Sequence, residues 1–117
     1  MSRFIDRSTI ETCDIGPCEC PEVNGTKPHE TDTIGIRRRI SYPDQLHLAD
    51  AYAQGALEGM WALFNLRVAR WNFLDEKGKP IPLSRAAWQN LDEATAKVIA
   101  EQIEKVREEG VDDLPNT

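Results

Sequence analysis

Apolar residues occupy almost every side of one long segment of the sequence, between Pro43 and Arg70. Pro43 suits the first turn of a helix, where its missing N–H is not needed, and Ser41 or Tyr42 would be the cap. The spacing predicts a single helix over 43–70. Only one narrow stripe of it is polar, and the apolar remainder comprises Leu46, Leu48, Ala49, Tyr52, Ala53, Leu57, Met60, Leu63, Phe64, Leu66 and Val68. Such a helix must be buried on more than one side.

A row of small residues at every fourth position marks one face of this predicted helix: Ala51, Gly55 and Gly59. Each glycine costs roughly 1 kcal/mol relative to alanine inside a helix, so we expect the close approach of another backbone as compensation. That backbone belongs either to the last helix of this chain or to another protein chain. In the second case, whether through self-association or a different partner, the expected contact residues are Gly55, Gly59, Met60, Leu63 and Phe64.

The C-terminal third predicts a bend followed by two helices. Asp75–Gly78 forms a turn, and Pro80 and Pro82 exclude a regular central strand after it. Ser84 can cap a short helix, and a final amphipathic helix follows and ends at Gly110. The apolar stripe of this last helix comprises Leu91, Thr95, Val98, Ile99, Ile103 and Val106.

The N-terminal third lacks a sustained period. Residues 1–32 are rich in Pro, Gly, Thr and Asp, and Thr33–Ile40 partly alternates like a short edge strand or extended arm. A chain of 117 residues suits one modest domain. We therefore predict a mainly α fold in which the long central helix is packed by the C-terminal amphipathic helix. Its parts are a small irregular or β arm (1–32), a helical domain (33–110) and a frayed tail (111–117).

Charge and motifs narrow the classes of function. The net charge is −6, and residues 91–117 carry eight acidic against three basic residues, so a nucleic-acid partner is not expected. The N-terminus lacks the apolar core of a signal peptide, and no stretch of about 18 uncharged apolar residues predicts a membrane span. The expected location is the cytosol. No nucleophile, phosphate-loop or metalloprotease motif occurs, so we do not expect an enzyme.

All three cysteines lie within Thr12–Glu30, together with one of the two histidines. Three cysteines cannot pair fully within one chain, and a reducing cytosol opposes disulfides. Two interpretations remain. The side chains of Cys13, Cys18, Cys20 and His29 could supply the donors of a structural zinc site, with turns at Gly16-Pro17 and Asn24-Gly25 folding them inward. Alternatively, the three cysteines are unpaired residues of a mobile arm.

The segment VARWNFLDEKGKPIPLSRAAWQNLD (68–92), preceded by IRRRISYPDQLHLADAYAQGALEG (36–59), resembles the tail assembly chaperones of long-tailed bacteriophages. The resemblance covers roughly Ile34–Val106, and the cysteine segment lies outside it. It implies a small, mainly helical protein in the cytoplasm of a bacterial host. Such a protein binds the tape-measure protein, recruits tail-tube subunits and leaves before the virion matures. The alternative function is a structural component of the virion, such as a tail-terminus or head–tail joining protein with a zinc-stabilised arm.

Overall fold

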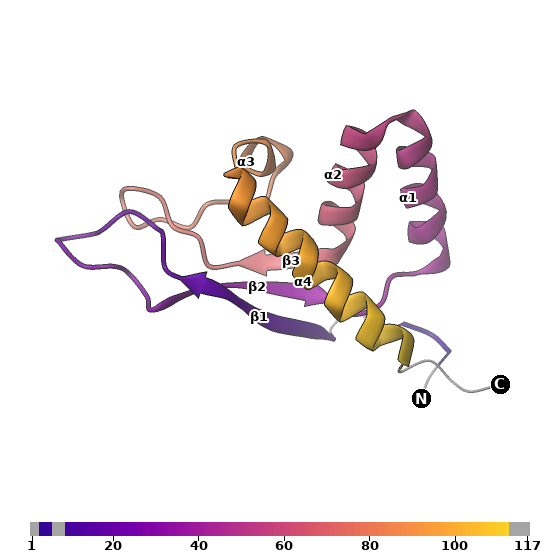
Figure 1. Cartoon of the computed structure of the whole chain (residues 1–117), viewed down its shortest axis with the longest axis horizontal. Coiled ribbons are helices and arrows are strands. Elements are labelled where there is room, and N and C mark those ends of the chain that lie inside the picture. The colour runs from indigo at the N-terminus through magenta and orange to yellow at the C-terminus, as the bar shows by residue number, and fades with distance from the viewer. Residues whose placement is uncertain (1–2, 6–8, 113–117) are drawn as a thin grey trace.

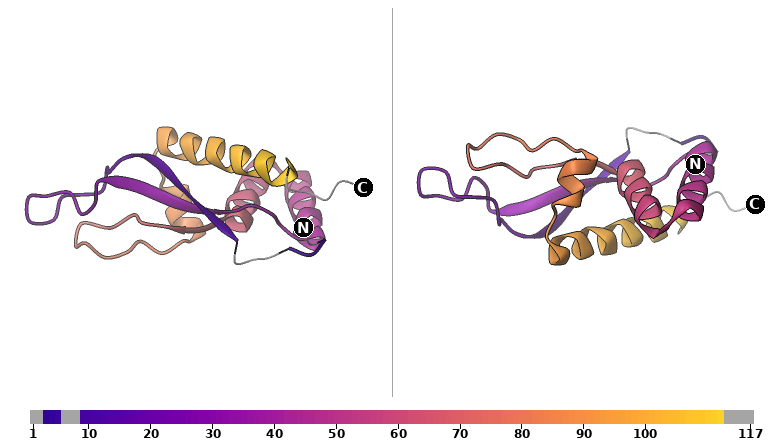
Figure 2. Two further views of the ribbon diagram at one scale, coloured as in Figure 1. Left: turned by 90° about the horizontal axis from the view of Figure 1, so that it is seen from below. Right: turned by 90° about the horizontal axis from the view of Figure 1, so that it is seen from above.

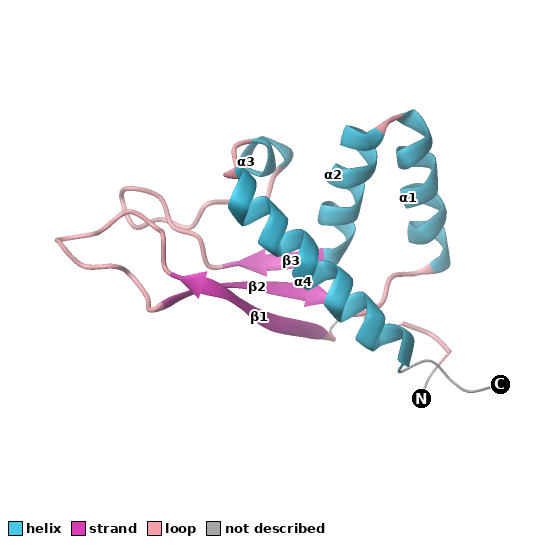
Figure 3. Cartoon of the chain, viewed as in Figure 1, coloured by secondary structure: helices cyan, strands magenta, loops and turns pink. Residues whose placement is uncertain are grey.

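The computed structural model describes residues 3–5 and 9–112, and these residues form a three-stranded antiparallel sheet and four helices, of which α2 (Ala56–Arg67) and α4 (Glu93–Asp112) contact the sheet (Figures 1 and 3). The strands β1 (Ile10–Pro17), β2 (Thr31–Arg37) and β3 (Val68–Trp71) are arranged in the order β1-β2-β3. The prediction of a mainly α fold is therefore wrong, because the structure is α+β.

Strand β1 shows a short alternation of exposed and partly buried residues, which the sequence analysis did not identify among the Pro, Gly, Thr and Asp residues of this segment. Thr12 and Asp14 are exposed, whereas Cys13 and Ile15 are partly buried and pack against the main core. This alternation is short, and it ends at a bulge between Asp14 and Gly16, where the pairing register of β1 with β2 shifts. Because β1 pairs with β2 along its whole length, residues 10–17 belong to the same sheet as 31–37. The boundary expected between residues 32 and 33 lies inside β2.

The single helix predicted over 43–70 is two helices and the start of a strand. Helix α1 (Tyr42–Gln54) is capped by the Ser41 hydroxyl, which accepts a hydrogen bond from the Asp44 N–H at 3.2 Å. Gly55 then adopts φ 147° and ψ 161°, a conformation available almost only to glycine, and the chain reverses into α2 (Ala56–Arg67). The two helices lie side by side as an antiparallel hairpin (Figure 1). Strand β3 follows α2 directly, so the helix ends three residues before Arg70.

The glycine row packs within this hairpin. A Cβ on Gly59 would lie 2.1 Å from the Cδ1 atom of the Tyr52 ring, so only glycine leaves room for that ring. Gly55 forms the reversal itself, and a Cβ there would meet no atom within 4 Å. The close contact at Gly59 is therefore with a side chain of α1, the neighbouring helix in the chain, whereas the expected contact was with the backbone of the last helix or of another protein chain.

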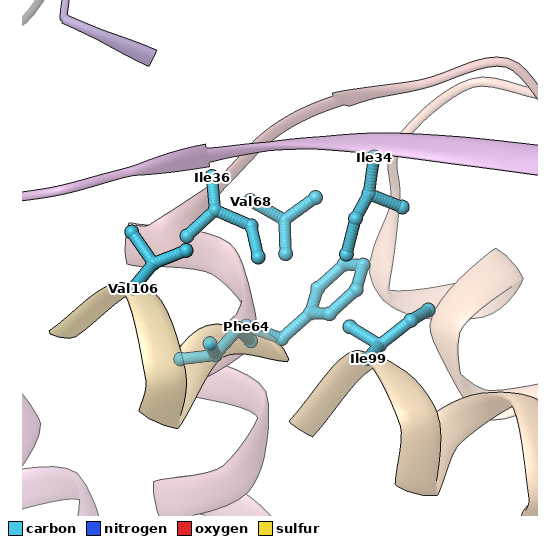
Figure 4. Packing of buried hydrophobic residues seen from close by; sticks show 7 residues of the cluster. Ile34, Ile36, Phe64, Val68, Ile99 and Val106 are labelled. Carbon is cyan, nitrogen blue, oxygen red and sulfur yellow. The ribbon is translucent and has the colours of Figure 1, made fainter. Parts of the chain in front are cut away.

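The last helix closes the core of the molecule. The short helix α3 (Arg85–Gln89), capped by Ser84, precedes α4 (Glu93–Asp112), which lies across one face of the sheet (Figures 1 and 2). The main buried cluster joins the strands, α2 and α4 (Figure 4), through Ile34, Ile36, Phe64, Val68, Ile99, Ile103 and Val106. The amphipathic pattern predicted for α4 is confirmed at its buried positions Ile99, Ile103 and Val106. Residues 113–117 of the expected tail lie outside the described residues, and 111–112 are helical.

Two loops extend from the same end of the sheet (Figure 2). The first connects β1 to β2, and the second is the bend between β3 and α3. Trp71 secures the second loop through a hydrogen bond of 2.6 Å from its Nε1 to the Ile81 carbonyl oxygen. Asn72 joins the bend to β2, because its side chain accepts from the Thr33 N–H and donates to the Thr31 carbonyl oxygen. Within the described residues, no helix has the length and apolar character needed to cross a membrane.

Candidate metal centre

A cluster of four potential metal ligands lies where the first loop leaves the sheet: Cys18, Cys20, His29 and Asp32. Strand pairing brings the two ends of the loop together, since Gly16 pairs with Asp32 and the Cys18 N–H donates to the Glu30 carbonyl oxygen at 3.0 Å. Cys18 and Cys20 follow β1 directly, and both belong to this group. One donor atom from each of the four residues lies within 4.8 Å of all the others.

The loop reverses at Asn24-Gly25, as the sequence predicted. Both residues have positive φ, 55° and 79°, and the flanking Val23 and Thr26 pair with each other through backbone hydrogen bonds. This is the geometry for which an Asn-Gly pair is favoured in a two-residue hairpin loop. The reversal brings His29 back beside Cys20, with 3.7 Å between His29 Nε2 and Cys20 Sγ.

Asp32 lies at the centre of the contacts among these residues. Its Oδ1 is 2.6 Å from His29 Nε2 and accepts from the Cys20 thiol at 3.4 Å. Its Oδ2 accepts a hydrogen bond from the Glu19 N–H at 2.9 Å, which fixes the carboxylate in the loop. Cys18, Cys20 and Asp32 are buried and His29 is partly buried. The donors therefore form an inward-facing group and not a set of surface side chains.

Backbone groups from both loops support the cluster. The Leu74 N–H, in the bend after β3, donates to Cys20 Sγ at 3.5 Å, and the Lys27 ammonium donates to the Cys20 carbonyl oxygen at 2.7 Å. Hydrogen bonds from N–H groups to sulfur stabilise a thiolate, and outer contacts of this kind orient metal ligands. The centre thus links the first loop to the second.

The acid–base properties of the cluster favour a cation. Burial raises the pKa of the Cys20 thiol to about 11, and hydrogen bonds with Cys18 and Asp32 add to this. Burial alone would also raise the pKa of Asp32, but hydrogen bonds from the Glu19 N–H, His29 and the two cysteines outweigh it and hold that pKa below its usual value. A carboxylate therefore lies against a protonated thiol. A metal ion would stabilise the carboxylate and the thiolate together. These four residues could bind a metal ion.

Sequence reasoning found three of these four ligands. The structure brings Cys18, Cys20 and His29 together, whereas Cys13 is not in the group. The Cys13 side chain lies on β1, with its Sγ 3.9 Å from the Glu11 carbonyl oxygen, and it packs against the core cluster. Asp32 was missed. Its signal is the His29-x-x-Asp32 spacing at the start of β2, but the chain has twenty acidic residues and spacing alone does not single one out.

The expected partner-binding residues fall into two groups. Met60, Leu63 and Phe64 line an apolar groove of about 540 Å³ between α2 and α4, which Trp88 of α3 also borders. Met60 and the neighbouring Leu57 are 53% and 56% exposed, whereas Phe64 is buried in the core. Gly55 and Gly59 do not line the groove, since Gly55 forms the α1–α2 reversal and Gly59 packs against the Tyr52 ring.

Comparisons of the chain with protein-family models, with curated proteins and with solved structures find no match.

Proposed function

We propose that this chain is a noncatalytic protein-binding protein whose apolar groove receives a helical segment of its partner. The groove carries the proposal. It has apolar walls from two helices, and Leu57 and Met60, which border it, are more than half exposed. Exposed apolar surface of this kind between helices typically receives the apolar face of a further helix.

The resemblance of residues 34–106 to tail assembly chaperones supports one partner. The proposed client is the tape-measure protein of a long-tailed phage, bound in the bacterial cytoplasm together with recruited tail-tube subunits. The client is long and helical, so it offers the kind of segment that the groove requires. The sheet is an addition to the mainly helical fold that the resemblance implied, and the residues that line the groove all belong to helices.

For the metal centre we propose a structural zinc ion. A tetrahedral zinc site with bonds of about 2.0–2.3 Å places its ligand atoms roughly 3.3–3.8 Å apart. The separations of Cys20 Sγ from His29 Nε2 and from Asp32 Oδ1 are 3.7 and 3.4 Å. The His29–Asp32 contact of 2.6 Å must open for such a site to form. Four protein ligands leave no position for a reacting water, which favours a structural role over catalysis.

The test is co-expression of this chain with the tape-measure protein of the same phage. The chain should raise the amount of soluble tape-measure protein, and Met60→Asp should abolish the effect by placing a charge in the groove. Leu46→Asp is the matched control, because Leu46 is also 53% exposed but lies on α1 away from the groove. Circular dichroism should show both variants folded.

Three outcomes would contradict the proposed chaperone function. Tape-measure solubility could be the same with and without the chain, or the two variants could behave alike. Mass spectrometry of purified virions could also find the chain in stoichiometric amount. The last result would favour the alternative, a virion component whose loop is held by zinc.

A further inference from the structure

Helix α1 carries an apolar stripe that stays exposed to solvent. We call it the α1 stripe, and its exposed members are Tyr42, Leu46, Ala49 and Ala53. The two large side chains, those of Tyr42 and Leu46, are 74% and 53% exposed. Leu48 and Ala51 lie on the opposite side of the helix, where they pack against α2. The stripe therefore faces away from the rest of the hairpin, of which α1 is the outer helix (Figure 1).

The spacing within the α1 stripe is that of a coiled-coil seam. Its residues follow one another at steps of four, three and four positions, the intervals at which two helices pack side chains into one another's gaps. The side chains also change in size along the helix. They are large in its first half, at Tyr42 and Leu46, and small in its second half, at Ala49 and Ala53. A partner helix must therefore be small where α1 is large, and large where α1 is small.

A second copy of α1 that runs antiparallel meets this requirement. Tyr42 and Ala53 are equally far from the midpoint between positions 47 and 48, and so are Leu46 and Ala49. A two-fold axis beside that midpoint places Tyr42 of each copy opposite Ala53 of the other, and Leu46 opposite Ala49. Every layer then joins a large side chain to a small one. A parallel pair would instead crowd the two tyrosines at one end and leave a gap between alanines at the other.

The residues that flank the α1 stripe are compatible with this pairing. They are Pro43, Gln45, Asp50 and Tyr52. Only Asp50 is charged, and the antiparallel alignment places it beside Pro43 of the second copy. On the other flank, Gln45 lies near Tyr52 of the second copy, where an amide and a hydroxyl group can form a hydrogen bond. Two chains whose net charge is −6 each would thus meet at a face with little charge of its own.

We propose that two copies of this chain associate through an antiparallel contact between their α1 stripes. The inference goes beyond the proposed function and does not depend on it, because Leu57 and Met60 of the groove belong to α2. One helix from each copy forms a smaller contact than the roughly 1,200–2,000 Å² of a standard interface. The dimer is therefore weak, with a dissociation constant in the micromolar range, and repulsion between two acidic chains opposes it at low salt.

Sedimentation equilibrium of the full chain, over roughly 5–500 µM, measures this association. The average mass should rise with concentration from the 13.2 kDa of one chain toward twice that value. Sodium chloride should shift the equilibrium toward the dimer, because it screens the repulsion between the two copies. A chain that stays monomeric over the whole range, with and without salt, would overturn the proposal.

A pair of charge variants tests both the face and its alignment. Leu46→Lys and Ala49→Glu each place a charge in the α1 stripe, and each should weaken association at least tenfold. Both positions are exposed, so circular dichroism should show both variants folded. An equimolar mixture should dimerise again, because the antiparallel alignment sets the new ammonium group of one copy opposite the new carboxylate of the other. A mixture that remains monomeric would show that the proposed alignment is wrong.

Leu83→Lys is the matched control for Leu46→Lys. Leu83 is also an exposed leucine, but it belongs to the bend before α3 and lines neither the groove nor the α1 stripe. The substitution changes the net charge by the same amount and should leave association unchanged. Equal dissociation of the two lysine variants would contradict the proposal, because the position of the charge would then not matter.

The association and the groove can be tested separately with the same proteins. Leu46→Asp should be monomeric and still raise the amount of soluble tape-measure protein, whereas Met60→Asp should dimerise and lose that effect. If tape-measure solubility does not respond to the chain while sedimentation finds the dimer, the proposed function fails and the dimer remains. If the unchanged chain is monomeric but raises tape-measure solubility, the dimer fails and the proposed function remains.

Discussion

At the scale of single residues, strand geometry decides which side chains join the candidate metal centre: it includes Asp32 and excludes Cys13. Cys13 precedes Cys18 by five residues of strand, which span about 16 Å. That distance removes Cys13 from the centre, whereas Asp32 returns to it because β2 runs antiparallel to β1 and pairs Asp32 with Gly16. Three ligands could be predicted from the sequence because cysteine and histidine are rare in this chain. The fourth could not, because its position depends on strand register.

The different positions of the cysteines predict different metal contents. Zinc should copurify with the chain at about one equivalent, measured by plasma mass spectrometry after gel filtration. Cys20→Ser should lose most of this zinc, because a buried ligand at the middle of the cluster is removed. Cys13→Ser should keep it, since Cys13 lies among core residues.

Cobalt substitution gives a second measurement on the same proteins. Cobalt bound by two thiolates should show sulfur-to-metal charge transfer in the near ultraviolet, and this band should persist in Cys13→Ser. Equal loss of zinc from the two serine variants would show that the ligand set is wrong.

At the scale of elements, the sequence predicted helices better than strands. Helices α3 and α4 and the start of α1 follow from their caps and apolar stripes. The break between α1 and α2 at Gly55 could not be predicted from the sequence, because a glycine inside an apolar helical pattern is compatible with either a continuous helix or a reversal. Residues 68–70 of β3 were predicted as helix because Val68 continues the apolar pattern of α2. What decides both cases is tertiary packing, on the ring of Tyr52 and on β2.

Replacement of Gly59 by alanine tests the packing of this hairpin, because its effect on the free energy of unfolding should change sign when Tyr52 is removed. Gly59→Ala should lower the free energy of unfolding by roughly 1–3 kcal/mol, because the new Cβ overlaps the Tyr52 ring. In a Tyr52→Ala background the same change should raise it by roughly 1 kcal/mol, the helix preference for alanine over glycine. Urea unfolding followed by circular dichroism measures both. A change of the same sign in the two backgrounds would mean that the ring and Gly59 do not pack together.

At the scale of the whole molecule, the chain forms an elongated body of 55 × 33 × 20 Å with the two loops at one end and the helical hairpin toward the other (Figure 1). The core cluster lies between them and does not include the four candidate ligands. The hairpin and the groove are therefore built from parts of the chain other than the metal centre. Partner binding in the groove and the order of the loop at the metal centre should depend on different regions.

Removal of the metal should loosen one end of the molecule and leave the core intact. Addition of a strong chelator should speed hydrogen exchange at the Cys18 and Leu74 amides, whose hydrogen bonds belong to the loop and the cluster. Exchange at the Ile34, Ile36 and Phe64 amides should change little, because α4 still covers them. Mass spectrometry of peptic fragments measures both regions.

The control for this experiment is Cys20→Ser, which should exchange like the chelated protein before any chelator is added and respond no further. Faster exchange throughout the chain would contradict the separation of the two regions, because it would show that the core depends on the centre.

The position of α4 has a consequence for biosynthesis. Ile99, Ile103 and Val106 complete a core whose other residues, from Ile34 to Val68, are made earlier. Because the chain leaves the ribosomal exit tunnel from its N-terminus, the inner face of the sheet and α2 emerge before α4 and at first lack their cover. The nascent chain therefore presents Ile34, Ile36 and Phe64 to ribosome-associated chaperones until α4 emerges. A message truncated before the codon for Glu93 would yield a product that cannot close its core and is left to proteolysis or aggregation.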